Sequence, residues 1–156
     1  LSAEETKRVT EVMSTLNKTA AEVMEPYDVH ACTDVTGFGL MGHALEMAKG
    51  SGTGITIFQS RVPVLPRVRE LAEQGFVPGG TKNNFAHVEA NITFPDSLDQ
   101  IGRYILCDAV TSGGLLISVN PDQSEQLLDE LQKAGVEASL IGEVTAENAG
   151  HIVVEA

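Results

Sequence analysis

The segment from His30 to His43 holds the densest group of side chains suited to chemistry, in the order HACTDVTGFGLMGH. It places one carboxylate, Asp34, and two threonine hydroxyls just before glycines and an apolar helical pattern. Free N–H groups at a helix N-terminus attract anions, and glycine lets the backbone approach them closely. Carboxylate oxygen is also a ligand type that Mg²⁺ prefers. The segment therefore suits a metal–phosphate site in which Asp34 holds Mg²⁺.

The same residues have ordinary structural roles as well. Asp34 could be a turn or capping residue, and Thr36 could be the N-cap of the helix that follows. The glycines could simply mark the start of that helix. The pattern alone leaves the chemical and the structural interpretation open.

Gly37, Gly39 and Gly42 also satisfy GxGxxG, the dinucleotide-binding spacing. The run before them is interrupted by polar residues, and no acid occurs between residues 47 and 70 to receive an adenosine ribose. Arg61 could instead accept a 2′-phosphate. A non-catalytic module that binds NADP or a small anion is therefore an open alternative.

A second motif, Cys107 to Gly114, reads CDAVTSGG and precedes an apolar run. Its hydroxyls and backbone amides could approach a ligand, but a tight turn into a buried strand explains the Thr111-Ser112-Gly113-Gly114 loop equally well. The role of this loop stays open.

The two cysteines, Cys32 and Cys107, have neither a CxxC spacing nor the number that a disulfide framework needs. A catalytic thiol requires a base or a positive field, and at strand spacing His30 would share a face with Cys32. A small structural cysteine is the commoner outcome. We therefore expect two reduced cysteines, and isolated structural or surface roles for His87 and His151.

The charge distribution bears directly on both motifs. Ten Lys and Arg against 22 Asp and Glu give a net charge of −12, which disfavours binding to nucleic acid or to an anionic membrane. No apolar run approaches the about 20 residues of a membrane span, so we expect a cytoplasmic protein. Neither 19–48 nor 104–132 contains a Lys or Arg, and both motifs lie inside these windows. Cations for a phosphate site should come from Mg²⁺ and another domain.

Apolar periodicity predicts the elements that must position these motifs. Ser2 and Glu5 fit a capping box, and apolar residues at helical spacing from Val9 to Met24 predict one long helix that Pro26 ends. Residues 77–80 are predicted as a loop. Further helices are predicted around 40–48, 68–72, 85–88, 98–105 and 127–131, and strands at 29–35, 55–58, 115–119, 137–145 and 151–155.

Helices and strands are interleaved along the chain. The last two predicted strands are joined closely enough to pair antiparallel, which a purely parallel sheet would not allow. We therefore expect an α+β fold with a mixed, largely antiparallel sheet packed with helices. Residues 1–156 are long enough for a single domain with one core.

The motifs also carry a family resemblance. The segment His30 to Ala48 resembles the signature of the selenophosphate synthetases, also called selenide, water dikinases. Four later segments are similar to that family in order and spacing: 62–66, 75–81, Asn83-Asn84 and 106–117. The resemblance covers only the family's C-terminal domain, which aminoimidazole ribonucleotide synthetase, thiamine-monophosphate kinase and a hydrogenase-maturation protein share.

The resemblance implies a reaction in which ATP, selenide and water yield selenophosphate, AMP and orthophosphate, with Mg²⁺ organising the phosphates. Asp34 matches the family's magnesium ligand in this domain. Thr33, Thr36 and Gly37 adjoin it, and we expect them to face the phosphates of ATP. Another ATP-using synthetase or kinase of the same superfamily is the alternative.

The resemblance also implies what this domain lacks. In the family, the N-terminal domain supplies the catalytic Cys or selenocysteine, its Lys, the phosphate loop and further Asp ligands, so we expect no catalytic residue here. Cys32 occupies a position where the family commonly has a small residue such as Ala. The chain begins with Leu1 and is expected to be an inactive fragment, missing the N-terminal domain, of a homodimeric parent.

Overall fold

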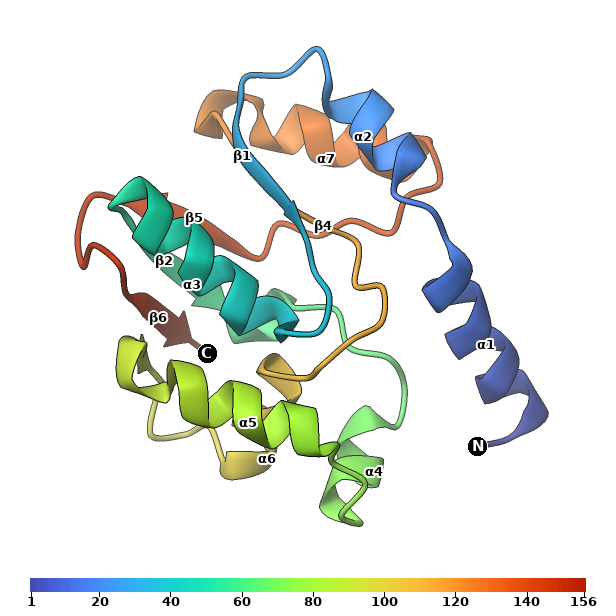
Figure 1. Ribbon diagram of the computed structural model, residues 1–156. Helices are drawn as coiled ribbons and strands as arrows, with labels where there is room; N and C mark the ends of the chain where they lie inside the picture. Colours follow the sequence, from blue (N-terminus) through green and yellow to red (C-terminus); the bar gives the residue numbers. More distant parts are fainter.

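The computed structural model describes residues 1–156 (Figure 1). The chain forms seven α-helices and six strands, joined in places by short 3₁₀ turns. The helices are α1 (Ala3–Ser14), α2 (Lys18–Met24), α3 (Gly39–Ser51), α4 (Val68–Glu73), α5 (Gly79–Val88), α6 (Gln100–Leu106) and α7 (Ser124–Lys133). The strands are β1 (Val29–Asp34), β2 (Gly54–Phe58), β3 (Ile92–Thr93), β4 (Leu115–Val119), β5 (Gly142–Thr145) and β6 (Ile152–Glu155). No helix is both long and apolar enough to span a membrane.

The strands form two sheets. β1 pairs antiparallel with β4, and the second sheet has the order β3-β6-β2-β5, in which β5 is antiparallel and β6 parallel to β2. β3 runs parallel to β6. The antiparallel ladders together align more residues than the parallel ones, which confirms the expected mixed, largely antiparallel α+β fold.

The expected pairing of the last two strands is wrong, because β2 lies between β5 and β6. The connection between them crosses the start of β2, where a Cβ added to Gly54 would lie 2.0 Å from the Glu147 carbonyl oxygen. The crossing chain is held by hydrogen bonds from Gly150 N to Thr53 O and from Ile55 N to His151 O. A glycine at the start of β2 therefore lets the chain pass over to the other side of that strand.

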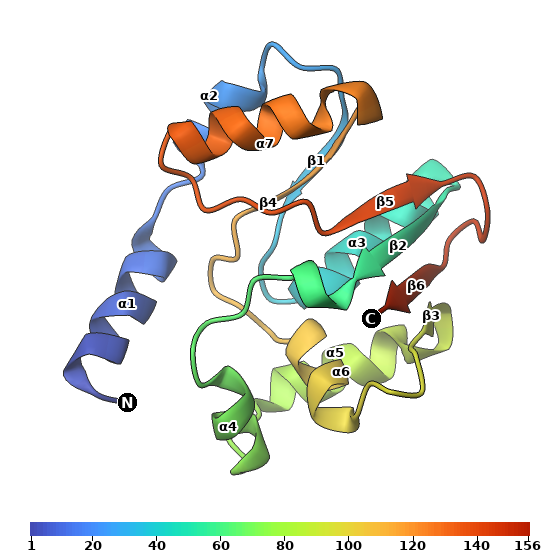
Figure 2. The same cartoon turned by 180° about the vertical axis from the view of Figure 1, so that it is seen from behind.

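The main core lies between α3 and the four-stranded sheet, with α5 and α6 packed on it (Figures 1 and 2). Met41, Ala44 and Leu45 of α3 meet Ile57 of β2 and Ile152 of β6 in this cluster. A smaller cluster joins α2 and α7 and packs against the apolar residues of β4. α3 is thus fixed on the sheet along its length, and its first turn is fixed with it.

The single long helix predicted for the N-terminus is two helices. The chain leaves the helix at Thr15, whose backbone is extended and whose hydroxyl bonds the Glu11 carbonyl oxygen at 2.7 Å. Ser, Thr and Asn side chains compete for the hydrogen bonds of a helical backbone. The polar residues at 14–17 therefore favour the end of the helix here over its continuation. Only α2 then reaches a core, through Ala20, while none of the residues of α1 is buried.

The prediction of a loop at 77–80 is wrong for its last two residues, because α5 already begins at Gly79. Glycine is a poor helix former, but tertiary packing overrides weak propensity. Thr81 and Val88 are both about 1% exposed, and they fix α5 against the rest of the molecule. The glycine pair thus forms the first turn of a helix whose buried face lies further along.

Candidate functional site

The site begins where β1 ends at Asp34 and α3 begins at Gly39. Gly39 has φ +70°, and an added Cβ would lie 2.5 Å from the Asp108 carbonyl oxygen and 2.9 Å from that of Cys107. Both the backbone conformation and the close approach require glycine here. The first predicted motif is therefore in direct contact with the second.

Backbone hydrogen bonds join the two motifs further. Gly113 N donates to Val35 O at 2.8 Å, and Val35 N donates to Gly114 O at 2.9 Å. Val110 N donates to Thr36 O at 3.4 Å. These bonds continue the β1–β4 pairing beyond the strands. We call residues 35–38 and 107–114 together the two-loop junction.

Helix α5 adds a third segment to this arrangement. The Thr81 hydroxyl donates to Asp108 Oδ1 at 2.5 Å and accepts from Ala109 N at 3.3 Å. Asn84 Nδ2 donates to the carbonyl oxygens of Gly37 and Cys107. Sequence reasoning did not single out Thr81, Asn84 or Asp108 as site residues. Their signal was only that they lie in segments that carry the family resemblance.

Asp34 is exposed at the last position of β1, opposite Leu115 of β4. Its carboxylate takes part in no hydrogen bond or ion pair within the chain, so both oxygens are free to bind a cation. Burial alternates along β1, with Cys32 and Asp34 exposed and Thr33 half-buried. Since neighbouring side chains of a strand point to opposite faces, the Thr33 hydroxyl and the Asp34 carboxylate lie on different faces. The Thr33 hydroxyl instead donates to the Asp34 carbonyl oxygen at 3.2 Å.

Thr36 is joined to His43 and Glu46 of α3. Thr36 Oγ1 lies 3.3 Å from His43 Nε2, and His43 Nδ1 lies 3.2 Å from Glu46 Oε2. An ionised carboxylate only accepts, so a neutral His43 donates from Nδ1 and accepts the Thr36 proton at Nε2. His43 is 8% exposed, and the centroid of its ring lies 5.7 Å from that of the Phe38 ring. This chain of contacts fixes the rotamer of Thr36 beside the helix start.

Neither cysteine is placed as a nucleophile. Partial desolvation, and to a lesser degree the charge of Asp34, raise the pKa of the Cys32 thiol. His30 pairs with Asp28 at 3.4 Å and His43 with Thr36 and Glu46, and neither ring forms a hydrogen bond with the Cys32 thiol. Burial raises the pKa of Cys107 to about 12. Both thiols are therefore disfavoured as thiolates.

The junction offers N–H groups and a carboxylate but no cation. The amide N–H groups of Thr36, Gly37 and Phe38 have no acceptor within the chain. Arg61 stacks over the Phe58 ring, 4.4 Å from its centroid. Within the junction itself there is no Lys or Arg. The two loops themselves therefore carry no cation, and Lys82 lies on the third segment, α5.

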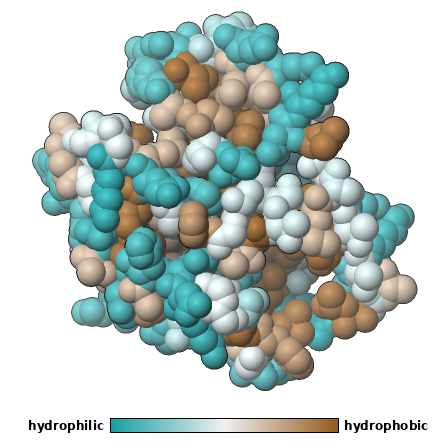
Figure 3. All heavy atoms as spheres, viewed as in Figure 1, coloured by the Kyte–Doolittle hydropathy of each residue, from teal (hydrophilic) through white to brown (hydrophobic).

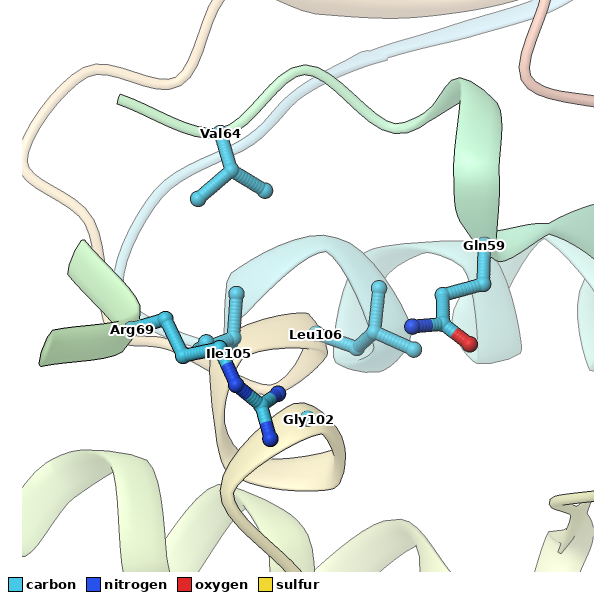
Figure 4. A pocket seen from close by; sticks show the side chains of 6 residues that line it. All are labelled: Gln59, Val64, Arg69, Gly102, Ile105 and Leu106. Atoms are coloured by element: carbon cyan, nitrogen blue, oxygen red, sulfur yellow. The ribbon is translucent and has the colours of Figure 1, made fainter. Parts of the chain in front are cut away.

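A hollow of about 220 Å³ lies elsewhere, between the chain after β2 and helices α4 and α6 (Figure 4). Gln59, Val64 and Arg69 border it, together with Gly102, Ile105 and Leu106 of α6. The Arg69 guanidinium is already engaged by Asp99 and by Glu73. None of the predicted site residues lines this hollow.

The dinucleotide-binding interpretation of the glycines lacks its structural context. That fold needs parallel strands of one sheet on either side of the helix. Here the strands before and after α3, β1 and β2, belong to different sheets, and β1 pairs antiparallel with β4. The GxGxxG spacing therefore does not mark a dinucleotide fold, and close packing accounts for Gly39 and Gly42 but not for Gly37, which has open space around it.

A family comparison matches residues 2–155 to the family described as AIR synthase related protein, C-terminal domain. The chain belongs to this family. Its sequence is similar to two bacterial selenide, water dikinases, being 47% identical over 150 residues to that of Myxococcus xanthus (strain DK1622) and 44% identical over 151 residues to that of Pelobacter propionicus (strain DSM 2379 / NBRC 103807 / OttBd1). These relatives confirm the resemblance seen in the sequence.

The alignments cover 95% and 96% of this chain but 43% of each relative, so the chain spans less than half their length. Among solved structures, E. coli HypE superposes with a TM-score of 0.64 at 26% identity, over 92% of this chain and 37% of HypE. A HypE crystallised with ATP has a TM-score of 0.56 at 22% identity, over 90% of this chain and 37% of that one, a likeness of fold alone. The expected fold relationship to a hydrogenase-maturation protein is thus confirmed.

Proposed function

We propose that this chain acts as the C-terminal domain of a selenophosphate synthetase. The full enzyme would convert ATP, selenide and water into selenophosphate, AMP and orthophosphate. One observation carries the proposal: Thr81, Asn84 and residues 107–114, which lie in segments that resemble this family, meet residues 35–38 just after the free carboxylate of Asp34. The 47% identity to a selenide, water dikinase supports the same assignment.

Asp34 would supply one oxygen ligand to Mg²⁺. Mg²⁺ requires near-octahedral oxygen coordination, and no cluster of three acidic, His or Cys side chains surrounds Asp34. The donor set thus fits a shared site, with the other ligands coming from phosphate, water and protein beyond this chain. When bound, Mg²⁺ would offset the charge of the phosphates.

Thr36 and Gly37 would face the phosphates of ATP. Their free N–H groups lie just before α3, whose N-terminus carries the positive end of the helix dipole. His43 holds the Thr36 side chain in one rotamer for this contact. Thr33 would act beside them by fixing the end of β1, through its bond to the Asp34 carbonyl oxygen.

The chain by itself would not catalyse the reaction. The junction lacks the cations that a triphosphate needs, and burial or desolvation disfavours both thiolates. In the full protein, which we propose to be cytoplasmic and, by the same resemblance, a homodimer, the missing domain would supply the nucleophile and the Lys. Measurable AMP production by residues 1–156 alone would contradict this division of roles.

Another ATP-using synthetase or kinase of the same superfamily is the second candidate. The structural likeness to HypE, at 26% identity, favours it only at the level of the superfamily. Assays of the full-length protein with selenide, an aminoimidazole precursor and thiamine monophosphate would separate the two. Activity with the aminoimidazole precursor or with thiamine monophosphate, and no activity with selenide as the substrate, would select the second candidate.

The role of Asp34 is tested by Asp34→Asn in the full-length protein. We expect selenide-dependent AMP formation to fall about 100-fold and the half-saturating Mg²⁺ concentration to rise, since a metal ligand and its charge are lost. The matched control is Asp96→Asn, which removes the same charge at an exposed position on the connection between β3 and α6. Equal rates and equal Mg²⁺ dependence in the two variants would contradict the assignment.

A further inference from the structure

A single side chain outside the predicted site joins the two halves of the two-loop junction. Asn84 Nδ2 donates to Gly37 O at 2.9 Å and to Cys107 O at 3.1 Å. Gly37 lies between β1 and α3, and Cys107 lies between α6 and β4. Asn84 itself comes from α5, so three separate segments meet at one amide group.

The chemistry of this contact is specific. Carbonyl oxygens only accept hydrogen bonds, so the group between them must donate, and an amide NH₂ has one proton for each. An aspartate has nearly the same shape but would accept only, and would repel both carbonyl oxygens. Thr81, one helical turn earlier, bonds Asp108 and Ala109 of the same loop. α5 therefore directs a polar face onto the junction.

The contact also fixes the direction of an N–H group. In a planar trans peptide, the carbonyl of one residue and the N–H of the next point in opposite directions. Because the Gly37 carbonyl points to Asn84, the Phe38 N–H must point away from α5. That N–H has no acceptor within the chain. Asn84 thus holds a free donor in a set orientation at the start of α3.

We propose that Asn84 is a positioning residue for the phosphate site, which it controls by joining the Gly37 and Cys107 carbonyl groups. This inference rests on the proposed function. Asn84 does not touch the phosphates. It holds the Phe38 N–H and the Asp34 end of β1 in the relative placement that a magnesium–nucleotide complex requires.

The test compares Asn84→Asp with Asn83→Asp in the full-length protein. Asn83 is the exposed neighbour on the same helix, so both variants add the same charge to α5. Calorimetry would measure binding of the magnesium complex of a non-hydrolysable ATP analogue. We expect about tenfold weaker binding for Asn84→Asp, because the loss of a group that orients ligand-binding residues typically costs about this much. We expect no change for Asn83→Asp.

Two further measurements keep the test decisive. Asn84→Ala removes the donor without adding a charge, and we expect about threefold weaker binding. Amide hydrogen exchange at Val110 and Gly113, which bond across the junction, should speed up in both Asn84 variants and not in Asn83→Asp. If Asn84→Asp fails to fold, Asn84→Ala decides the outcome.

The outcomes separate this inference from the proposed function. A wild-type protein that neither binds the magnesium–nucleotide complex nor forms AMP with selenide would overturn both. A wild-type protein that does both, with Asn84 variants that bind as tightly as Asn83→Asp, would overturn only the role of Asn84.

Discussion

The two-loop junction and helix α1 are held to the molecule in opposite ways. The junction is fixed by backbone hydrogen bonds, by Asn84 and by a glycine with no room for a side chain. α1 buries no residue, and it is linked to the rest by ion pairs of Glu5 with Arg67 at 2.6 Å and Arg8 with Glu137 at 2.5 Å. On the face of the molecule drawn in Figure 3, hydrophobic residues lie in separate patches among hydrophilic ones.

The difference indicates where stability is needed for function. Exposed ion pairs contribute little to the free energy of unfolding, because solvent and salt screen the charges. Ordering two long side chains also costs conformational entropy. Several backbone hydrogen bonds together with close packing set a geometry that changes only at high cost. We therefore expect the region that carries the candidate site to be the more rigid one, and α1 to be able to move without disturbing it.

The largest effect expected is that of Gly39→Ala. A Cβ there would meet two backbone carbonyl oxygens at 2.5 and 2.9 Å, in a conformation with φ +70° that Ala adopts poorly. Overpacking and the positive φ together should lower the free energy of unfolding by about 4 kcal/mol. Urea unfolding would measure it. Gly50→Ala, in the same helix with nothing within 4 Å, should be neutral or stabilising. Equal losses in the two variants would show that the junction is not closely packed.

The next comparison sets Leu45→Ala against Leu16→Ala. Leu45 is 3% exposed within the main core, and its truncation should cost about 3 kcal/mol. Leu16 is 78% exposed just after α1, so the same change should stay within about 0.5 kcal/mol. Chemical denaturation of both variants measures the two changes in the free energy of unfolding. A large loss from Leu16→Ala would mean that this segment packs against the body after all.

Local patterns predicted what local forces determine. The apolar runs of β2 and β4 and the helical spacing of α3 and α7 identified those elements, because these patterns are carried by the residues of each segment alone. Asp34 and the glycines after it were recognisable from residue type. These are properties of single segments, and a single sequence displays them directly.

Contacts between distant segments could not be predicted in this way. The insertion of β2 between β5 and β6 depends on a chain crossing at Gly54. The bonds of Thr81 to Asp108 and of Asn84 to Gly37 join residues with no shared periodicity. The break after Ser14 depends on polar side chains whose competition with the helix is too weak to read with certainty. The strand order and the bonds of Thr81 and Asn84 are decided by tertiary packing, and the break after Ser14 by weak local competition.

The smallest effect expected is the response of α1 to acid. Hydrogen bonds from the Ser2 backbone N–H and then from Arg67 lower the pKa of Glu5 to about 2, from a usual value of 4.5. Since the folded pKa is the lower one, this attachment is fully present above about pH 4.5 and is lost as the pH falls toward 2. Carbon chemical shifts measured by NMR should show α1 losing helicity over that window while α3 does not. Glu5→Gln should already weaken α1 at pH 7, whereas Glu4→Gln, at an exposed position without an ion pair, should not. If both variants leave α1 unchanged at neutral pH, the helix is held by something other than its ion pair with Arg67 and its capping box.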